Sequence, residues 1–427
     1  MTPQPAVITQ VQQVRPDMPD RLAGKTATLV FLAFAAGYFC STLLRAITAT
    51  LAPVLTQEFA LQARDLGLLA GGYFLGFAAV QLPMGTWLDR HGPKRVILWF
   101  LSLAVVGCLA FSAASSFAGL LMARVLVGMG VGACLMAALT GYRRWFDVAL
   151  LLRANSWMLM TGSLGMLTST LPVQWLMPLT GWRPLFWLMA GMVVLSMVAI
   201  AGIVPKWSQA KASALTPTPP EASGYAPIWR SRYFRKLVPL AFVNYGGMVA
   251  VQTLWAGPWM LKVTGNTPLE SATGLFWINT SMLVTFWSWG MVNPYLARSG
   301  WHATRLITWG VPLSLAVLAV NVVGGSAIGW PGWALFCMTS SVLGLAQPAV
   351  GMSFPAALAG RAMSAFNLVT FAGVFIAQWG LGLLIDVFAA VGLAQAASFQ
   401  AAMAVYLCGG IAAYSYFVWL KADNSSQ

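Results

Sequence analysis

The chain has 427 residues, of which 59% are hydrophobic and only 8% are charged. A soluble domain carries about 25% charged residues, so this composition excludes an ordinary soluble protein and favours a chain that crosses a membrane repeatedly. The net charge of +14 does not indicate nucleic-acid binding, because the basic residues are distributed over many breaks between apolar runs and form no single patch.

Apolar runs about 20 residues long follow one another along the chain, which is the length that a helix needs to cross about 30 Å of hydrocarbon. The sequence therefore predicts an all-α membrane protein with twelve spans. They are Ala27–Ala52, Leu66–Thr86, Val96–Ala114, Phe117–Thr140, Ala149–Trp175, Pro184–Val204, Leu237–Leu261, Ala272–Tyr295, Ile307–Val323, Trp330–Met352, Ala362–Leu384 and Ser398–Leu420.

A polar stretch separates the first six spans from the last six. Its segment 214–224 is rich in Pro, Ser and Thr and cannot form a packed core, so it predicts a linker. We expect an N-terminal tail (1–25), a six-helix bundle (26–205), a linker (206–236), a second six-helix bundle (237–420) and a C-terminal tail (421–427).

The distribution of Lys and Arg predicts the orientation of the spans. With both termini in the cytoplasm, most of the 24 basic residues lie on cytoplasmic segments, as the positive-inside rule requires. The polar first residues show no short apolar core with a cleavage site, so they predict a cytoplasmic tail and not a cleaved signal. We expect a multi-pass protein of the inner membrane, embedded in the lipid bilayer.

The break after the second span contains a motif, Gly85-Thr-Trp-Leu-Asp-Arg-His-Gly-Pro-Lys-Arg95. A carboxylate at a helix end beside a basic turn can form charge-assisted bonds across an interface between bundles. The segment resembles the signature loop of the major facilitator superfamily, Gly-x-x-x-Asp-Arg-x-Gly-x-Lys/Arg-Arg. The resemblance implies that the loop stabilises the outward-facing state of a transporter, with gating roles for Gly85, Asp89, Arg90, Gly92 and Arg95; the alternative is a solvated basic loop that only sets topology.

The fourth span carries a second motif, because Arg124–Gly130 resembles the Arg-x-x-x-Gly-x-Gly pattern of the same superfamily. An arginine within a span costs at least about 2.5 kcal/mol unless it faces protein or water. We therefore expect Arg124 to point inward and to act in conformational change; the alternative is an arginine that extends to the membrane surface. The superfamily resemblance implies two pseudo-symmetric six-helix bundles with the substrate site between them.

Arg45 lies near the middle of the first span, where a cation indicates a functional site. A guanidinium suits carboxylate or phosphate because it can donate two parallel hydrogen bonds. The segment 37–55 resembles the first span of the organophosphate/phosphate antiporter branch, and that resemblance implies that Arg45 binds a substrate anion. The alternative is a buried arginine that bonds only to helix carbonyls or another span.

The seventh span lacks the second arginine of that branch and offers Asn244, Tyr245 and Gln252 as polar candidates. One cation favours a monovalent anion such as a carboxylate over a dianionic phosphate ester. With Arg45, Tyr38 and Gln347, these three residues form the predicted substrate-binding set. Further inward-facing polar candidates are Tyr73, Gln81, Asn279, Asn367 and Gln378.

The sequence predicts transport and not catalysis. No span contains paired catalytic carboxylates, a His cluster or a Ser/His/Asp set, so we expect no enzyme activity, no cofactor and no metal site. None of the ten acidic residues lies in the central third of a predicted span, which argues against a carboxylate proton relay. We expect a monomeric secondary transporter that moves a small organic anion by alternating access; an exporter of drugs or metabolites and a transporter-like sensor are the alternatives. The fifth span lacks the Gly-Pro-x-x-Gly-Gly signature of drug/proton antiporters.

Overall fold

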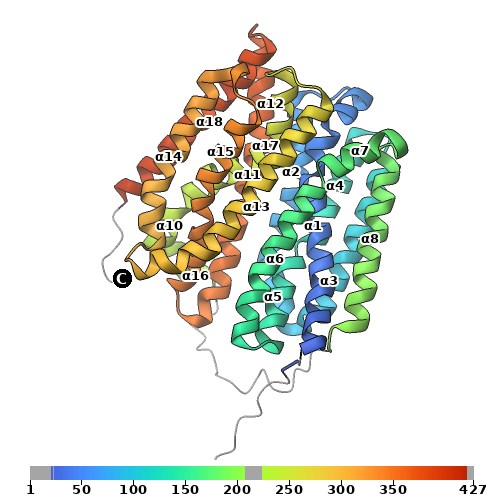
Figure 1. Ribbon diagram of the computed structural model, residues 1–427, viewed down its shortest axis with the longest axis vertical. Helices are drawn as coiled ribbons and strands as arrows, with labels where there is room; N and C mark the ends of the chain where they lie inside the picture. Colours follow the sequence, from blue (N-terminus) through green and yellow to red (C-terminus); the bar gives the residue numbers. More distant parts are fainter. Residues whose placement is uncertain (1–20, 23, 207–223, 421–427) are drawn as a thin grey trace, which may run out of the picture.

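The computed structural model describes residues 21–22, 24–206 and 224–420. This part of the chain folds into helices that lie roughly side by side, with no strand among the described residues (Figure 1). The predicted tails 1–25 and 421–427 and the predicted linker lie largely outside the described residues. The all-α fold of two pseudo-symmetric six-helix bundles is confirmed.

The first half of the chain contains eight helical elements, since two of its spans are broken. They are α1 (Gly24–Phe59), α2 (Ala63–Ala79), α3 (Gln81–Ala113), α4 (Phe117–Val131), α5 (Cys134–Trp145), α6 (Val148–Thr168), α7 (Leu171–Thr180) and α8 (Trp182–Ile203).

The second half has more irregular backbone. Its elements are α9 (Ala226–Arg230), α10 (Arg232–Pro239), the π-helical η3 (Leu240–Tyr245), α11 (Gly246–Ala250), the π-helical η4 (Val251–Trp255), α12 (Ala256–Lys262), α13 (Pro268–Arg298), α14 (Ala303–Gly324), the 3₁₀ turn η5 (Gly325–Ala327), α15 (Trp330–Ser340), the 3₁₀ turn η6 (Ser341–Leu345), α16 (Ala346–Met352), α17 (Ala356–Ala390) and α18 (Gln395–Trp419).

Ten helical segments within the described residues are long and apolar enough to cross a membrane. The two remaining predicted spans correspond to α6 with α7 and to α13. Some predicted boundaries were wrong. Helix α1 does not end at Ala52 but continues through Pro53 to Phe59. A proline inside a membrane helix is tolerated where neighbouring segments form hydrogen bonds with the backbone groups that it leaves free.

The break predicted at Gly85–Arg95 is much shorter in the structure. Helical backbone extends through most of it, and the chain reverses direction at Gly92, whose φ of 75° lies in the region that favours glycine. The second and third spans are therefore joined by a tight turn and not by a long loop.

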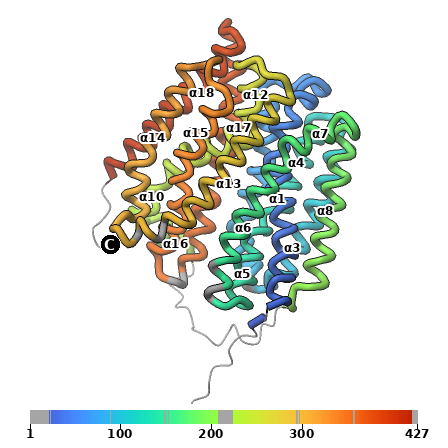
Figure 2. The backbone as a smooth tube through the Cα atoms, viewed as in Figure 1, coloured from blue at the N-terminus to red at the C-terminus, as the bar shows by residue number. Residues whose placement is uncertain are grey.

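The two halves of the chain lie beside each other, with α1–α8 on one side and α10–α18 on the other (Figures 1 and 2). They meet where α2 packs on α17, α6 packs on α13, and α1 packs on η4 and α12. We call the end where α8 stops and α9 begins the linker end. The end where α2 begins and α17 stops is the far end.

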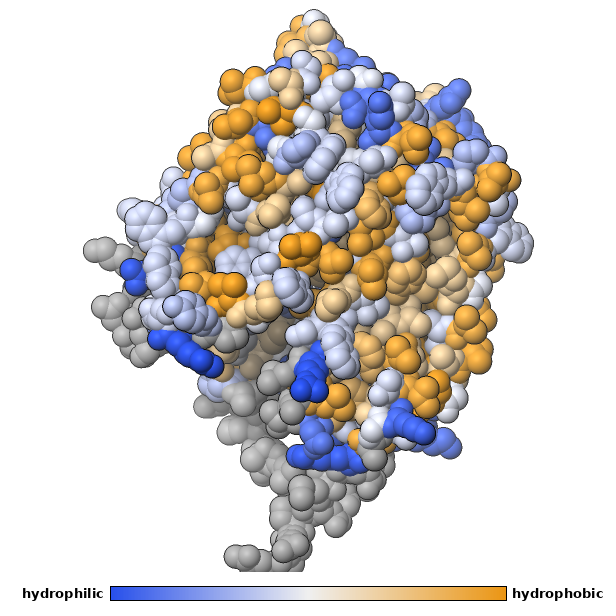
Figure 3. Space-filling model, in the orientation of Figure 1, coloured by the Kyte–Doolittle hydropathy of each residue, from blue (hydrophilic) through white to orange (hydrophobic). Residues whose placement is uncertain are grey.

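On the face shown in Figure 3, hydrophobic residues predominate at mid-height and hydrophilic residues gather toward the ends of the molecule. Large hydrophobic side chains are exposed along outer helices, among them Leu195 on α8 and Val323 on α14. Burial in a bilayer removes such side chains from water. The chain is therefore a multi-pass membrane protein.

Candidate functional site

A cavity of about 170 Å³ lies between the two halves, near mid-height. Both halves contribute to its wall. The lining residues are Tyr38, Ser41, Arg45, Phe77, Gln81, Val131, Gly132, Leu135, Met136, Leu159, Ala241, Tyr245, Val249, Leu343, Gly344, Ala346, Gln347, Phe366, Asn367, Thr370 and Phe371. Two of the wall's segments, Val131–Gly132 and Leu343–Gly344, coincide with breaks in regular α-helix, which membranes tolerate beside a cavity.

Arg45 provides the cavity's cation. It lies on the same face of α1 as Tyr38 and Ser41, because residues four and seven apart lie above one another on a helix. Its Nε atom is buried and has no hydrogen-bond partner among the described residues. None of the ion pairs found in the described part of the chain includes this guanidinium.

Two aromatic rings, one from each half, flank the guanidinium of Arg45. Its central carbon lies 5.6 Å from the centroid of the Phe77 ring on α2 and 5.7 Å from that of the Phe371 ring on α17. These two rings approach each other to 4.4 Å between centroids. Cation–π contacts with these rings stabilise the positive charge, but the rings offer no oxygen or nitrogen atom that could accept hydrogen bonds from the N–H groups of Arg45. The Nε of Arg45 therefore keeps hydrogen-bonding capacity for another group.

The remaining polar lining is neutral. Tyr245 from η3, Gln347 from α16, and Asn367 and Thr370 from α17 belong to the second half, and Gln81 to the first. No described residue in the wall is Asp, Glu or His. The cavity thus combines one positive charge, several neutral hydrogen-bonding groups and aromatic surface.

The structure brings together four residues of the predicted substrate-binding set, namely Tyr38, Arg45, Tyr245 and Gln347, and also Gln81 and Asn367 from the wider set of candidates. Sequence reasoning missed Phe77 and Phe371. An aromatic side chain in an apolar span normally packs in the core, so the sequence carries no signal that separates these two from the others.

Asn244 and Gln252 do not line this cavity. The Asn244 side-chain amide donates to the carbonyl of Gly410 over 3.4 Å, and the Gln252 amide donates to Oδ1 of Asn279 over 3.0 Å. Both bonds link helices within the second half. Because both side chains bond within the second half and neither lines the cavity, we leave these two residues out of the proposed site.

Arg124 is fully buried and ties α4 to α1, although it does not line the cavity. One guanidinium nitrogen donates to the carbonyl of Leu44 over 2.9 Å and another to Oγ1 of Thr48 over 2.6 Å. The Tyr73 ring lies 5.4 Å away. The arginine points inward and does not extend to the surface.

The predicted signature loop lies at the linker end. Arg90 and Arg95 are exposed, Gly92 forms the turn, and a Cβ added at Gly85 would meet no atom within 4 Å. The side chain of Asp89 lies outside the described part of the chain, and with it the predicted bond across the bundle interface. The gating role of this loop stays a prediction.

At the far end, α2 and α17 are joined by backbone contacts that sequence reasoning did not predict. The carboxylate of Asp386, near the end of α17, accepts the N–H of Ala63 over 3.2 Å and that of Arg64 over 2.9 Å. A Cβ added at Gly67 would lie 2.3 Å from the carbonyl oxygen of Gln378, so the two main chains touch directly. The far end is therefore closed.

Comparison with known proteins agrees with this architecture. Residues 34–378 match the family described as Major Facilitator Superfamily. Among curated relatives, a probable sulfoacetate transporter of Cupriavidus necator is 25% identical over 254 residues, which cover 56% of this chain and 59% of that protein's length. The multidrug resistance protein MdtL of Escherichia coli is 29% identical over 357 residues, covering 76% of this chain and 86% of that protein.

Solved structures share the fold. The crystal structure of a bacterial homologue of the human lysosomal transporter Spinster, inward-facing and unoccupied, has a TM-score of 0.75 at 16% identity, covering 93% of this chain and 98% of that one. That of a D-xylose–proton symporter has a TM-score of 0.72 at 12% identity, covering 94% and 99%.

Proposed function

Because the chain belongs to the Major Facilitator Superfamily, and is thus a transporter and not an enzyme, we propose that it carries a small organic monoanion across the inner membrane by alternating access of its two bundles. The substrate binds in the central cavity. The closed far end faces the periplasm in this arrangement, and both termini lie in the cytoplasm. The protein works as a monomer.

The observation that carries this proposal is the position of Arg45 in the cavity wall. It is the one cation among the lining residues, and its Nε has no partner among the described residues. The Nε of Arg124 also lacks a partner, but that arginine bonds to α1 and lines no part of this cavity. A carboxylate or sulfonate that enters the cavity can therefore accept hydrogen bonds from Arg45 and compensate its charge.

The rest of the wall supports a monoanion with an organic body. The cavity has one cation, so a second negative charge on the substrate finds no partner among the lining residues. Gln81, Gln347 and Asn367 can bond to hydroxyl or carbonyl groups of the substrate, and the rings of Phe77 and Phe371 favour a carbon skeleton. One relative is named as a probable transporter of sulfoacetate, which supports an organic anion but, as a dianion, does not support the single charge.

Drug export is the second candidate, and a different observation favours it. The multidrug resistance protein MdtL aligns with a larger share of this chain than the sulfoacetate transporter does. Aromatic residues in the cavity wall also suit flat organic cations. The positive charge of Arg45 in the wall opposes a cationic substrate, because like charges repel at close range in a site of low dielectric constant.

Uptake into proteoliposomes tests the proposal with labelled lactate as a monoanion, sulfoacetate as a dianion and glycerol as a neutral control. We expect lactate exchange in the wild type and an Arg45→Ala rate about tenfold or more lower, since a charge-assisted bond contributes at least about 1.4 kcal/mol. Arg45→Lys should retain part of the rate. Arg64→Ala, which removes an exposed cation outside the cavity, is the matched control.

Two outcomes contradict the proposal. If the Arg45→Ala variant exchanges labelled anions at the full rate, the guanidinium is not the anion site. If vesicles show no flux of any anion but extrude ethidium, the protein is a drug exporter.

A further inference from the structure

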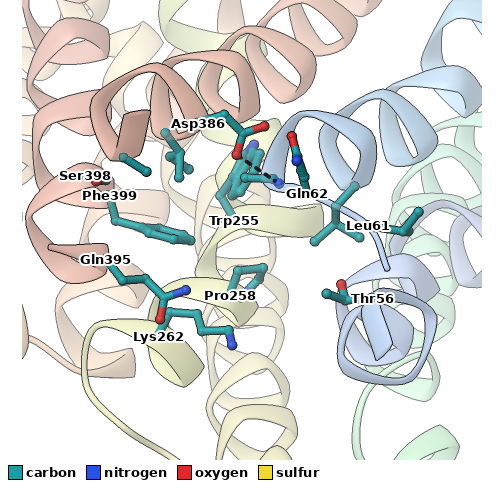
Figure 4. Close-up of a pocket in the computed structure, with 14 residues that line it drawn as sticks. Thr56, Leu61, Gln62, Trp255, Pro258, Lys262, Asp386, Gln395, Ser398 and Phe399 are labelled. Atoms are coloured by element: carbon teal, nitrogen blue, oxygen red, sulfur yellow. Dashed lines mark hydrogen bonds between the residues drawn. The ribbon is translucent and has the colours of Figure 1, made fainter. Parts of the chain in front are cut away.

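A second cavity, of about 330 Å³, lies at the far end and is larger than the central one (Figure 4). It is separate from the proposed substrate site, with which it shares no lining residue. Thr56 of α1 and Gln62, Ala63 and Leu66 at the start of α2 form one wall. Helices α12, α17 and α18 form the other, so the cavity straddles the two halves.

One side of this cavity is apolar and fixed. The rings of Trp255 and Phe399 stand 6.0 Å apart between centroids in an edge-to-face arrangement, and Pro258 lies beside them. The indole N–H of Trp255 donates to the carbonyl of Gln378 over 3.1 Å, which holds its ring in place. Trp255 is fully buried and supports Phe399, which is therefore the ring that can face a flat apolar group.

The charged groups in the wall differ in availability. The Asp386 carboxylate already accepts two backbone N–H groups at the start of α2, where the helix dipole further compensates its charge. Lys262 is exposed, and no ion pair in the described part of the chain involves its ammonium group. Gln395 lies beside Lys262 in the same wall (Figure 4). The available charge in this cavity is therefore positive.

We propose that the far-end cavity is a regulatory site for a small aromatic organic anion, which contacts both halves and holds the far end closed. Its ring lies against Phe399, which packs on Trp255, and its acid group pairs with Lys262. The walls separate when the far end opens, so the ligand binds only the closed state. It shifts the equilibrium toward that state and slows transport.

Binding of labelled benzoate to the protein in lipid nanodiscs tests the site. The measurement uses the Arg45→Ala background, in which the proposed central anion site is removed. Benzoate should still bind, and benzamide and benzylamine should compete poorly. Adding Lys262→Gln should weaken binding up to about fivefold, the range of an exposed ion pair. Adding Arg64→Gln, which removes a charge at the same end but outside the cavity wall, should leave it unchanged.

Hydrogen exchange in the same Arg45→Ala background gives a second readout, which binding of benzoate to Arg45 cannot affect. The amides of Ala63 and Arg64 donate to Asp386, so their exchange rate reports the closure of the far end. Benzoate should slow their exchange in the Arg45→Ala background, and with Lys262→Gln added the same slowing should require up to about fivefold more benzoate.

Three results overturn the inference. The first is an equal loss of benzoate binding in Lys262→Gln and Arg64→Gln, and the second is tighter binding of benzylamine than of benzoate. The third is hydrogen exchange at Ala63 and Arg64 that stays unchanged at saturating benzoate. The central site is judged separately, by lactate exchange in the wild type and Arg45→Ala. Failure of one proposal therefore leaves the other standing.

Discussion

Two arginines inside the membrane spans show how the same side chain serves two purposes. Arg124 bonds to a carbonyl and a hydroxyl of α1 and is fully buried. Arg45 faces a cavity and has a buried Nε without a partner. The Nε of both arginines lacks a partner among the described residues, so the two differ in their surroundings. The terminal nitrogens of Arg124 bond to α1 and stabilise the fold, whereas Arg45 faces a cavity in which a ligand can compensate its charge.

Substitution by methionine should separate the two roles. Arg124→Met removes hydrogen bonds from a charged donor, each contributing about 1.5–3 kcal/mol, so it should lower the midpoint of thermal unfolding in detergent markedly. Arg45→Met should leave that midpoint nearly unchanged and abolish anion exchange. Thermal unfolding and lactate exchange, measured on the same preparations, test this. A larger loss of stability in Arg45→Met than in Arg124→Met would contradict it.

At the scale of elements, the contact between α2 and α17 depends on small residues. Gly67 approaches the carbonyl of Gln378, and a Cβ added at Gly382 would lie 2.4 Å from the carbonyl oxygen of Ala63. The carboxylate of Asp386 then caps the first turn of α2. These contacts bring the two main chains together at the far end without intervening side chains.

Gly67→Val should force the two helices apart and open the far end. We expect faster hydrogen exchange at Ala63 and Arg64 and slower lactate exchange, because the variant cannot complete the transport cycle. Gly191→Val on α8 is the matched control, since an added Cβ there meets no atom within 4 Å. Unchanged exchange at Ala63 in Gly67→Val would show that the interface tolerates a side chain.

The distribution of basic residues over the whole molecule predicts its orientation. Both termini are predicted to be cytoplasmic. Green fluorescent protein fused after residue 427 should therefore be fluorescent, and alkaline phosphatase fused at the same place should be inactive. A cysteine introduced at an exposed position of the linker end should react with an impermeant thiol reagent only after the membrane is opened. An active phosphatase fusion would reverse the proposed orientation.

The described lining of the central cavity also predicts a weak response to pH. Without Asp, Glu or His in that wall, no lining group has an ordinary pKa between pH 6 and 8. The rate of lactate exchange should change by less than about twofold across this range, where lactate stays ionised. Proteoliposomes with equal pH on both sides provide the measurement, and a steep change would indicate a titratable group elsewhere on the transport path.

The sequence predicts most of the spans well, because their length and hydropathy are those of membrane helices. It also finds Arg45, since a charge stands out in an apolar run. It cannot assign the neutral polar residues, because a span surrounded by protein and lipid shows little amphipathic pattern. Asn244 and Tyr245 are neighbours, yet only Tyr245 lines the cavity. The partners of Gly67 and Asp386 are hundreds of residues away and leave no local signal.

Direct contact between main chains at the far end has a consequence for leakage of ions. If two helices move apart, a long side chain between them can change its rotamer and keep partial contact. A glycine has no side chain, so its contact is lost as soon as the two main chains separate. The contacts at Gly67 and Gly382 therefore form together or are lost together. A state in which the far end is only partly open has few contacts that stabilise it. Such short-lived intermediates let a carrier work in an energised membrane without dissipating its ion gradients.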